Sequence, residues 1–380
     1  MKKYNLTSVK EWVSPSLRYE IRRVVSWLRE QFSRAHIWNW EIARLPLHAG
    51  SPFEIVYIGR KSQRDFAMSL LNVTPAAGIN LTVDCTTGRR VMVSEMPFPG
   101  ALRIPSTLNS VVPLGRPIEE ITSNFHSQLR RELTKKRKSY RMQQVLDSTE
   151  IERVDREMLR PYANARHGER AVQIELDEVK RMAQLYGRLD ILLLGDEVVG
   201  CQQGHVITRS GKRYWSTNRC GYPEAVFSDP KRLRDSNSFN IYLAMEWAIE
   251  KGFDYYDIGC SLAQPGDGLL EWKRRRGGEL DTMGNSLYFH VRLPKVGAAQ
   301  FLWDAPLFAV EHNKLALHFG LPNGPSDEEF MQHYREMGFG GLSKVYLHCA
   351  KKLDENIIDM LRSLYSHQKL PPSVEIVPSN

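Results

Sequence analysis

The sequence contains no apolar run that approaches the ~20 residues of a membrane-spanning helix. The two lysines near its start are not followed by an apolar segment, so we expect no signal peptide. Its five cysteines are scattered singly, and no pair has the spacing of metal ligands. These absences argue against a membrane-spanning protein, a disulfide scaffold and a cysteine-based metal site. We therefore expect a cytoplasmic protein with reduced cysteines.

Two functional signatures are also missing. The segment IGCSL places Cys260 and Ser261 after a predicted strand, but it lacks the second glycine of a nucleophile elbow. A serine or cysteine hydrolase is therefore not favoured. No recognised nucleic-acid-binding module is present, so a non-catalytic nucleic-acid-binding protein would depend on basic patches alone. We keep that class as an alternative.

Positive charge is what the sequence has in excess. Lys and Arg number 52 against 44 Asp and Glu, a formal net charge of +8 that favours anionic partners. The charge is densest in residues 118–145, where a helix pattern carries seven cations in twelve positions and one acid, Glu132. The cations are Arg130, Arg131, Lys135, Lys136, Arg137, Lys138 and Arg141. We predict that this basic connecting helix contacts a polyanion, with a solvated linker helix as the alternative.

The length of 380 residues and the hydrophobic content of 42% predict two globular domains. Near the start, residues 14–33 have the pattern of an amphipathic helix. Arginines fall largely on one side of it, which we interpret as a solvated basic face. The apolar positions on the other side are Leu17, Ile21, Val24, Val25, Leu28 and Phe32. A strand over residues 53–58 and a short helix over residues 64–72 complete the pattern of an α+β half.

The second half of the chain predicts a sheet followed by a helix and one more strand. Three strand patterns separated by tight turns, at residues 189–194, 198–206 and 212–217, indicate an antiparallel meander. A helix is predicted from Ser238 to Lys251, with its N-cap among residues 235–238, and a strand over residues 254–258. A polar loop over residues 259–268 then leads to an apolar turn and a cationic run that begins at Lys273. A loop of this kind at the carboxyl end of a strand is a common place for a binding site.

Four pieces of this region carry a family resemblance: LRRELTKKRKSY, EWAIEKG, YYDIG and DGLLEWKRRRGG. Together they resemble GNAT-fold acyltransferases of the Fem type, the peptidoglycan aminoacyltransferases and their relatives, over roughly residues 125–292. The resemblance implies an α+β, GNAT-like fold with two GNAT-type halves. It implies an N-terminal half over residues 1–117, the basic connecting helix over residues 118–145, and an acyltransferase domain over residues 146–380. The implied activity is amide formation by transfer of an acyl group to an amine.

The resemblance also bears on the acyl donor. Enzymes of this fold that use acyl-CoA have a glycine-containing loop that holds the pyrophosphate at a helix N-terminus. Residues 232–237 stand in that place here, both glycines are replaced, and one replacement is an acid. Fem-type proteins share this departure and use aminoacyl-tRNA, so we expect tRNA as a partner and acyl-CoA as the alternative. The expected donor-binding residues are Arg130, Arg131, Lys135, Lys136, Arg232, Arg234, Asn237 and Ser238.

Lys273 and Asp257 are the expected catalytic residues. By resemblance, Lys273 stabilises the charge that develops on the reacting carbonyl, and Asp257 orients or deprotonates the amine. A surface lysine and a loop-capping aspartate are their structural alternatives. We expect no metal and no tightly bound cofactor, and the acceptor could be a cell-wall precursor, an amino sugar or a peptide-like small molecule. The expected pocket residues are Tyr256, Gly266, Gly268 and Trp272.

Overall fold

The computed structural model describes residues 15–73, 88–168, 171, 173–283, 285, 287–351, 353, 355–365, 368 and 371–379. The chain divides into two compact units. Unit 1 comprises Met1–Arg22, Val111–Gly259 and Arg275–Gly277, and unit 2 comprises Arg23–Ser110, Cys260–Arg274 and Gly278–Asn380. This division differs from the expected boundaries, because residues 278–380 belong with the N-terminal segment rather than with the predicted acyltransferase domain.

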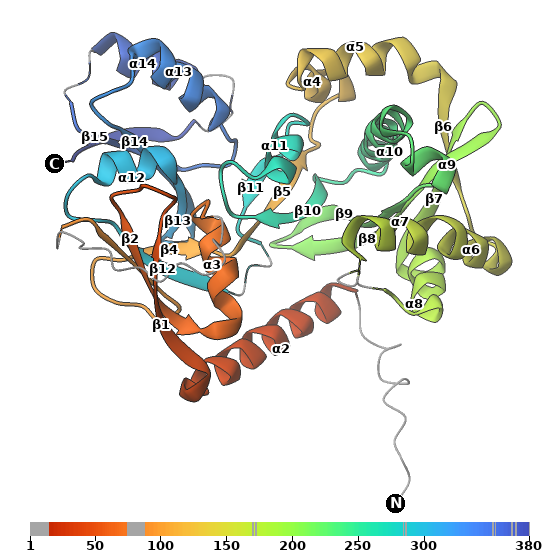
Figure 1. Ribbon diagram of the computed structural model, residues 1–380. Helices are drawn as coiled ribbons and strands as arrows, with labels where there is room; N and C mark the ends of the chain where they lie inside the picture. Colours follow the sequence, from red (N-terminus) through yellow and green to blue (C-terminus); the bar gives the residue numbers. More distant parts are fainter. Residues whose placement is uncertain are drawn as a thin grey trace, which may run out of the picture. The chain divides into compact units, whose positions relative to one another are not determined.

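A seven-stranded sheet has the order β11-β5-β10-β9-β8-β7-β6, and its strands β6 to β9 lie wholly in unit 1. Strands β7, β8 and β9 form the predicted antiparallel meander, and β10 pairs in parallel with β9. Figure 1 shows this sheet with α10 across it. The strands are β5 (Thr107–Pro113), β6 (Tyr140–Gln144), β7 (Gly187–Leu194), β8 (Glu197–Arg209), β9 (Lys212–Gly221), β10 (Tyr255–Leu262) and β11 (Glu279–Asp281). The order of meander, helix and parallel strand confirms the fold that the resemblance implies for this part of the chain.

Helix α10 (Pro230–Glu250) begins two turns before the predicted start. The side chain of Asp229 caps it by accepting hydrogen bonds from the main-chain N–H groups of Lys231 and Arg232, at 2.9 and 3.1 Å. Pro230 occupies the first turn, where no N–H donor is needed. The predicted cap at residues 235–238 is therefore wrong, since those residues lie inside the helix.

The predicted connecting helix is broken. It comprises α4 (Ile118–Ser123), α5 (Ser127–Lys136) and a 3₁₀ turn, η3 (Arg137–Ser139), and it ends in β6. Strand β6 forms because Tyr140 is buried in stacked contact with Phe239 of α10, with ring centroids 3.9 Å apart. The other helices of unit 1 are α6 (Ser148–Val154), α7 (Arg160–His167), α8 (Leu176–Arg181) and α9 (Glu224–Phe227), with π-helical segments η4 (Asp155–Leu159) and η6 (Met182–Tyr186).

Unit 2 contains a five-stranded mixed sheet of order β1-β2-β3-β12-β4. Strands β2 and β3 are parallel, and the other neighbours are antiparallel. Strand β12 lies between β3 and β4 although it is nearly two hundred residues later in the chain, which explains why unit 2 is discontinuous. The strands are β1 (Trp40–Pro46), β2 (Glu54–Arg60), β3 (Arg90–Ser94), β4 (Leu102–Pro105) and β12 (Tyr288–Arg292). The helices beside them are α2 (Pro15–Ala35) and α3 (Arg64–Leu70), with the 3₁₀ turns η1 (Ile37–Asn39) and η2 (Lys61–Gln63).

A second sheet of unit 2 has the order β13-β14-β15-β16. Its strands are β13 (Leu307–Glu311), β14 (Lys314–Leu321), β15 (Lys344–Cys349) and β16 (Ser373–Pro378), and its helices are α12 (Ala298–Asp304), α13 (Asp327–Glu336) and α14 (Glu355–Ser363). One continuous apolar core joins this sheet to the five-stranded sheet. Within the described part of the chain, no helix is long and apolar enough to cross a membrane.

Candidate functional site

Strands β9 and β10 of unit 1 separate from one another partway along their length. Their parallel ladder covers only Tyr255–Asp257 against Tyr214–Ser216. Both strands continue beyond the last pair, β9 to Gly221 and β10 to Leu262. We call the place where they separate the fork, and we define it by Ser216, Thr217, Tyr256 and Asp257. Beyond the last pair, the facing main-chain groups of the two strands are not paired with one another. On β10, the Gly259 N–H donates to Asp257 and the Cys260 carbonyl accepts from Lys273.

Asp257 lies at the last pair of the ladder and is buried. Its carboxylate accepts hydrogen bonds from the Ser216 hydroxyl at 2.8 Å and from the Gly259 main-chain N–H at 2.7 Å. Gly259 has a φ of +84°, a conformation that other residues rarely adopt. Asp257 therefore holds the local turn, as the loop-capping alternative required, and its carboxyl group lies at the fork.

Tyr256 is completely buried next to the fork. Its hydroxyl accepts hydrogen bonds from the Gln202 side-chain amide at 2.6 Å and from the Thr217 hydroxyl at 2.9 Å. Burial raises the pKa of Tyr256, so the phenol stays neutral. Through these hydrogen bonds Tyr256 stabilises the strands that form the fork. Its predicted role in lining the substrate pocket stays a prediction.

A second buried polar cluster surrounds Tyr222, between β9 and α10. The Tyr222 hydroxyl donates to Asn237 Oδ1 at 3.0 Å, and Asn240 donates from Nδ2 to the main-chain oxygen of Cys201 at 3.0 Å. Arg276 reaches the Ser238 hydroxyl at 3.2 Å.

Burial is also the main influence on Arg276, which is 6% exposed. It lowers the pKa of the Arg276 guanidinium to about 10. The cluster includes two expected donor-binding residues, Asn237 and Ser238, but neither lies at the helix N-terminus where a pyrophosphate would bind. No sequence pattern marked Tyr222 or Asn240 as site residues, and nothing in the sequence distinguished Arg276 from the exposed Arg275 beside it.

Lys273 lies in unit 2, on the short helix α11 (Gly268–Arg274). Its Nζ donates a hydrogen bond of 2.8 Å to the main-chain oxygen of Cys260. Lys273 is 2% exposed, whereas Arg275 is exposed. Burial thus distinguishes Lys273 from the exposed Arg275 of the same run. The surface-lysine alternative is therefore wrong. Its role in catalysis stays a prediction.

The other predicted pocket residues of unit 2 lie in and after the loop that precedes α11. Trp272 is half-buried, and Gly266 and Gly268 are exposed. A Cβ added at Gly266 would come within 3.1 Å of the Gln264 side chain, whereas one at Gly268 would meet nothing within 4 Å. The space beside Gly268 is therefore open, which is what we expect of a position that a ligand approaches closely.

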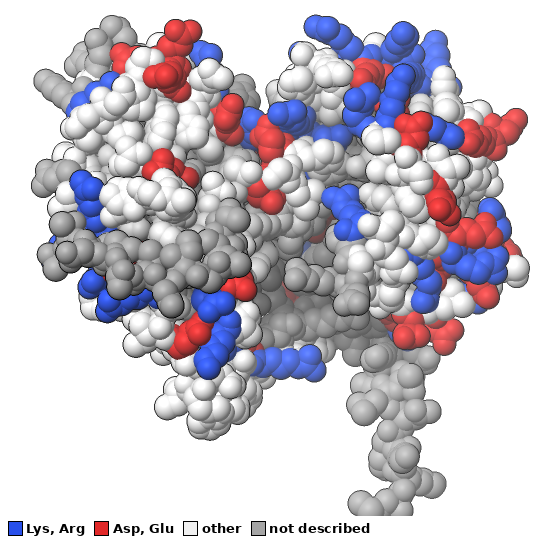
Figure 2. All heavy atoms as spheres, in the orientation of Figure 1, with Lys and Arg blue, Asp and Glu red and all other residues white. Residues whose placement is uncertain are grey.

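The basic residues predicted on the connecting helix divide into two groups. Arg130, Arg131 and Lys135 of α5 are exposed. Lys136 is half-buried and pairs with Asp235 of α10 at 2.6 Å, and this hydrogen bond raises the pKa of Lys136. Figure 2 shows lysine and arginine gathered over α5. The three exposed residues can contact a ligand, whereas Lys136 holds α5 against α10 through its ion pair with Asp235.

Arg232 and Arg234 of α10 are only partly available for donor binding. Arg232 pairs with Glu197 at 2.6 Å, and Arg234 is exposed with Glu132 at 3.7 Å. The first main-chain N–H groups of α10 already bind the Asp229 carboxylate. A pyrophosphate at this helix N-terminus would have to displace that carboxylate, so the helix start does not suit the usual acyl-CoA arrangement.

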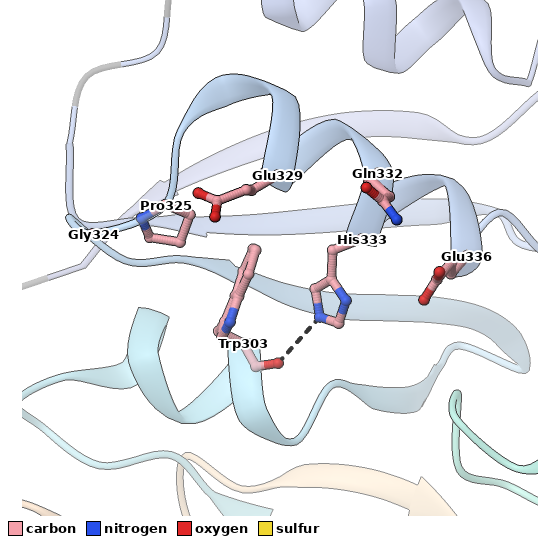
Figure 3. Close-up of a pocket in the computed structure, with 7 residues that line it drawn as sticks. All are labelled: Trp303, Gly324, Pro325, Glu329, Gln332, His333 and Glu336. Atoms are coloured by element: carbon pink, nitrogen blue, oxygen red, sulfur yellow. Dashed lines mark hydrogen bonds between the residues drawn. The ribbon is translucent and has the colours of Figure 1, made fainter.

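A separate pocket lies in unit 2, at α13 (Figure 3). His333 lies next to Trp303, with ring centroids 4.4 Å apart and its Nε2 3.3 Å from the Trp303 main-chain oxygen. Glu329 accepts from the main-chain N–H of Ser326 at 2.8 Å, as part of the capping box of α13. These side chains are engaged in holding the helix, and none of them is a predicted site residue.

No family model matches the chain, and no curated protein matches it. Among solved structures, FemX is 11% identical at a TM-score of 0.38, covering 66% of this chain and 88% of its own. L-PGS from Bacillus licheniformis is 14% identical at a TM-score of 0.35, covering 67% and 80%. A GCN5-related N-acetyltransferase from Sphaerobacter thermophilus is 10% identical at a TM-score of 0.28, covering 66% and 74%. Since these scores are low, the fold assignment rests on the strand order and register described above.

Proposed function

We propose that this protein is an amide-forming N-acyltransferase that takes an aminoacyl group from aminoacyl-tRNA and transfers it to an amine. The observation that carries the proposal is the fork. Its buried carboxylate, Asp257, lies where β9 and β10 separate. The carboxylate at the fork can receive a proton from an amine beside it.

The reaction requires a proton to move and a negative charge to be stabilised. The amine nitrogen attacks the ester carbonyl carbon, a C–N bond forms, and the C–O bond to the tRNA ribose breaks. Asp257 accepts the proton that the amine loses, and the departing ribose oxygen takes up a proton. A cation near the carbonyl oxygen lowers the barrier of such a reaction. The resemblance gives this role to Lys273, and its substitution tests that role separately.

Two features favour tRNA over acyl-CoA. Arg130, Arg131 and Lys135 are exposed on one short helix, which suits contact with several phosphates of a nucleic acid. The N-terminus of α10 is occupied by the Asp229 carboxylate, which opposes a pyrophosphate at that position. The acceptor class stays open among cell-wall precursors, amino sugars and peptide-like amines.

The test is transfer of labelled aminoacyl groups from charged tRNA to a panel of amine acceptors, beside a panel of acyl-CoA donors. We expect activity with charged tRNA that RNase abolishes. Replacing Arg130, Arg131 and Lys135 with Ala should raise the apparent KM for the donor about tenfold or more. It should also reduce the slope of log affinity against log salt by roughly 2 to 3, because three phosphate contacts are lost.

A triple variant with Arg44, Arg156 and Arg362 replaced by Ala is the matched control, since these arginines are 65, 67 and 63% exposed and lie outside α5. Lys136 is left unchanged, because its loss would leave the Asp235 carboxylate without its cation. Full activity with acyl-CoA, indifference to RNase and equal behaviour of the two triple variants would remove the tRNA proposal. RNA binding without any transfer would instead favour the non-catalytic nucleic-acid-binding protein.

A further inference from the structure

Helix α2 packs on unit 2 through its polar side. Glu30 forms an ion pair with Arg60 of β2, and Ser33 accepts a hydrogen bond of 2.7 Å from the same guanidinium. Arg34 donates to the main-chain oxygen of Tyr288 at 3.3 Å. Arg60 is 4% exposed and also binds the buried Glu95. The face of α2 that contacts the sheet is therefore made of charged and hydroxyl groups.

The apolar side of α2 faces away from the sheet. Val24, Leu28 and Phe32 are separated by four residues each, so they share one face of the helix. They are 54, 41 and 68% exposed. This is the reverse of the usual arrangement, in which the apolar stripe covers the core. We interpreted the basic side as a solvated face, and the apolar side is exposed as well.

The exposed apolar surface continues in the residues that follow α2. Ile37 and Trp38 are 71 and 75% exposed, and Ile42 of β1 is 72% exposed. Figure 2 shows uncharged atoms at the corner where α2 passes into β1. Burying side chains of this size contributes about 1.5–3 kcal/mol each, so a partner that covers them gains substantial free energy.

Charge on the same helix identifies the kind of partner. Helix α2 carries five arginines against two glutamates. Arg34 and Glu30 are used against the sheet, whereas Arg29 is exposed. A helix with Leu28 and Phe32 on one side and the exposed Arg29 beside them has the composition of an interfacial helix that binds anionic lipid surfaces. Exposed tryptophan is also typical of residues at the membrane–water boundary.

We propose that α2 and the turn η1 form a membrane-docking surface, with the apolar stripe inserted among the headgroups of an acidic bilayer and Arg29 paired with a lipid phosphate. Phe32 of the stripe and Trp38 of η1 are the inserting side chains. The proposal concerns where the protein binds and does not depend on the reaction that it catalyses. A protein partner would be expected to meet a groove or a pocket, whereas a single exposed helix lies flat on a surface.

The test is co-sedimentation of the full chain with vesicles of phosphatidylcholine alone and of phosphatidylcholine with added phosphatidylglycerol. We expect binding to the acidic vesicles that falls steeply with salt, with a blue shift of tryptophan fluorescence. Replacing Phe32 and Trp38 with Ser should reduce the partition coefficient at least about tenfold, and Arg29→Glu should reduce it several-fold. Since Phe32, Trp38 and Arg29 are exposed, these variants should retain the melting temperature.

Leu185→Ser with Met96→Ser is the matched control, because these side chains are 76 and 50% exposed and lie outside α2. Absence of binding to acidic vesicles would overturn the proposal, as would equal binding of the control and the Phe32/Trp38 variant. A dimer that depends on Phe32 and Trp38, without any vesicle binding, would also overturn it and would identify a second copy of the chain as the occupant.

Discussion

The Nζ atom of Lys273 lies 2.8 Å from the main-chain oxygen of Cys260, in a position where only 2% of the lysine is exposed. Lys273→Ala would leave that carbonyl without this donor and create a cavity. We therefore expect the free energy of unfolding to fall by about 2–4 kcal/mol, measured by chemical denaturation. If Lys273 also stabilises the oxyanion, kcat should fall roughly a hundred- to a thousandfold at temperatures where the variant is folded.

Two further variants separate the structural role of Lys273 from the catalytic one. Lys273→Met retains most of the volume and removes the charge, so it should recover part of the stability and none of the activity. Arg275→Ala changes an exposed cation of the same run, and we expect a small effect on both. A Lys273→Met protein with full activity would contradict the catalytic assignment and leave Lys273 as a support for the end of β10.

Asp257→Asn tests the proton acceptor at the fork. The amide keeps an oxygen that can accept from the Gly259 N–H, so the local turn should persist. Because the amide cannot take a proton, we expect kcat to fall by about two to four orders of magnitude and the acidic limb of the pH–rate profile to disappear. Ser216→Ala, which removes only one hydrogen bond to Asp257, serves as the control and should retain that limb. An Asp257→Asn variant with an unchanged pH profile would show that the carboxylate only caps the turn.

Asp229→Ala tests the start of α10. The variant removes the acceptor for two main-chain N–H groups, and we expect the free energy of unfolding to fall by about 0.5–2 kcal/mol. Asp229→Asn retains the cap and should cost only a few tenths of a kcal/mol, through the lost interaction with the helix dipole. Equal losses in the two variants, measured by urea denaturation, would mean that charge rather than capping sets the stability.

A buried histidine pair in the second sheet of unit 2 should make stability depend on pH. His318 Nδ1 and His348 Nε2 are 3.1 Å apart, and burial lowers the pKa of His318 to about 3 and of His348 to about 4. Both are neutral in the folded protein, whereas unfolded histidine takes up a proton near pH 6.5. The free energy of unfolding should therefore fall as the pH drops from about 6.5 to about 4, by up to roughly 1.4 kcal/mol per pH unit for each histidine.

His348→Gln removes one of the two titrating groups, and urea denaturation at several pH values should give a shallower dependence. His36→Gln is the control, since His36 is exposed and its replacement should leave the slope unchanged. A wild-type slope in the His348→Gln protein would contradict the assignment of the acid sensitivity to the pair.

Local patterns were sufficient to predict the middle of unit 1. The meander has alternating strands and tight turns at Gly195 and Gly211, both with positive φ. The residues next to each strand end are therefore sufficient to predict where that strand ends. The strand after α10 was predicted for the same reason, whereas its parallel pairing was implied by the family resemblance. The connecting helix was predicted too long because its composition is helical throughout, while the burial of Tyr140 against Phe239 favours a strand.

Contacts between distant segments were not predictable from one sequence. Nothing local marks residues 288–292 as the strand between β3 and β4, since that pairing joins residues far apart in the chain. The same holds within the run from Lys273 to Arg276, where Lys273 and Arg276 are buried, Arg274 is half-buried and Arg275 is exposed. Side-chain chemistry is similar at all four, and only packing distinguishes them.

The insertion of β12 between β3 and β4 has a consequence for synthesis on the ribosome. Strand β4 ends at Pro105, but β12, its neighbour in the sheet among the described residues, is not fully translated until Arg292. At ordinary elongation rates, roughly 10 to 40 seconds pass between the translation of β4 and the translation of that partner strand. Residues 111–259 form an uninterrupted stretch that emerges during this interval. We therefore expect unit 1 to acquire its structure first, while the N-terminal strands remain exposed to chaperones and to premature pairing.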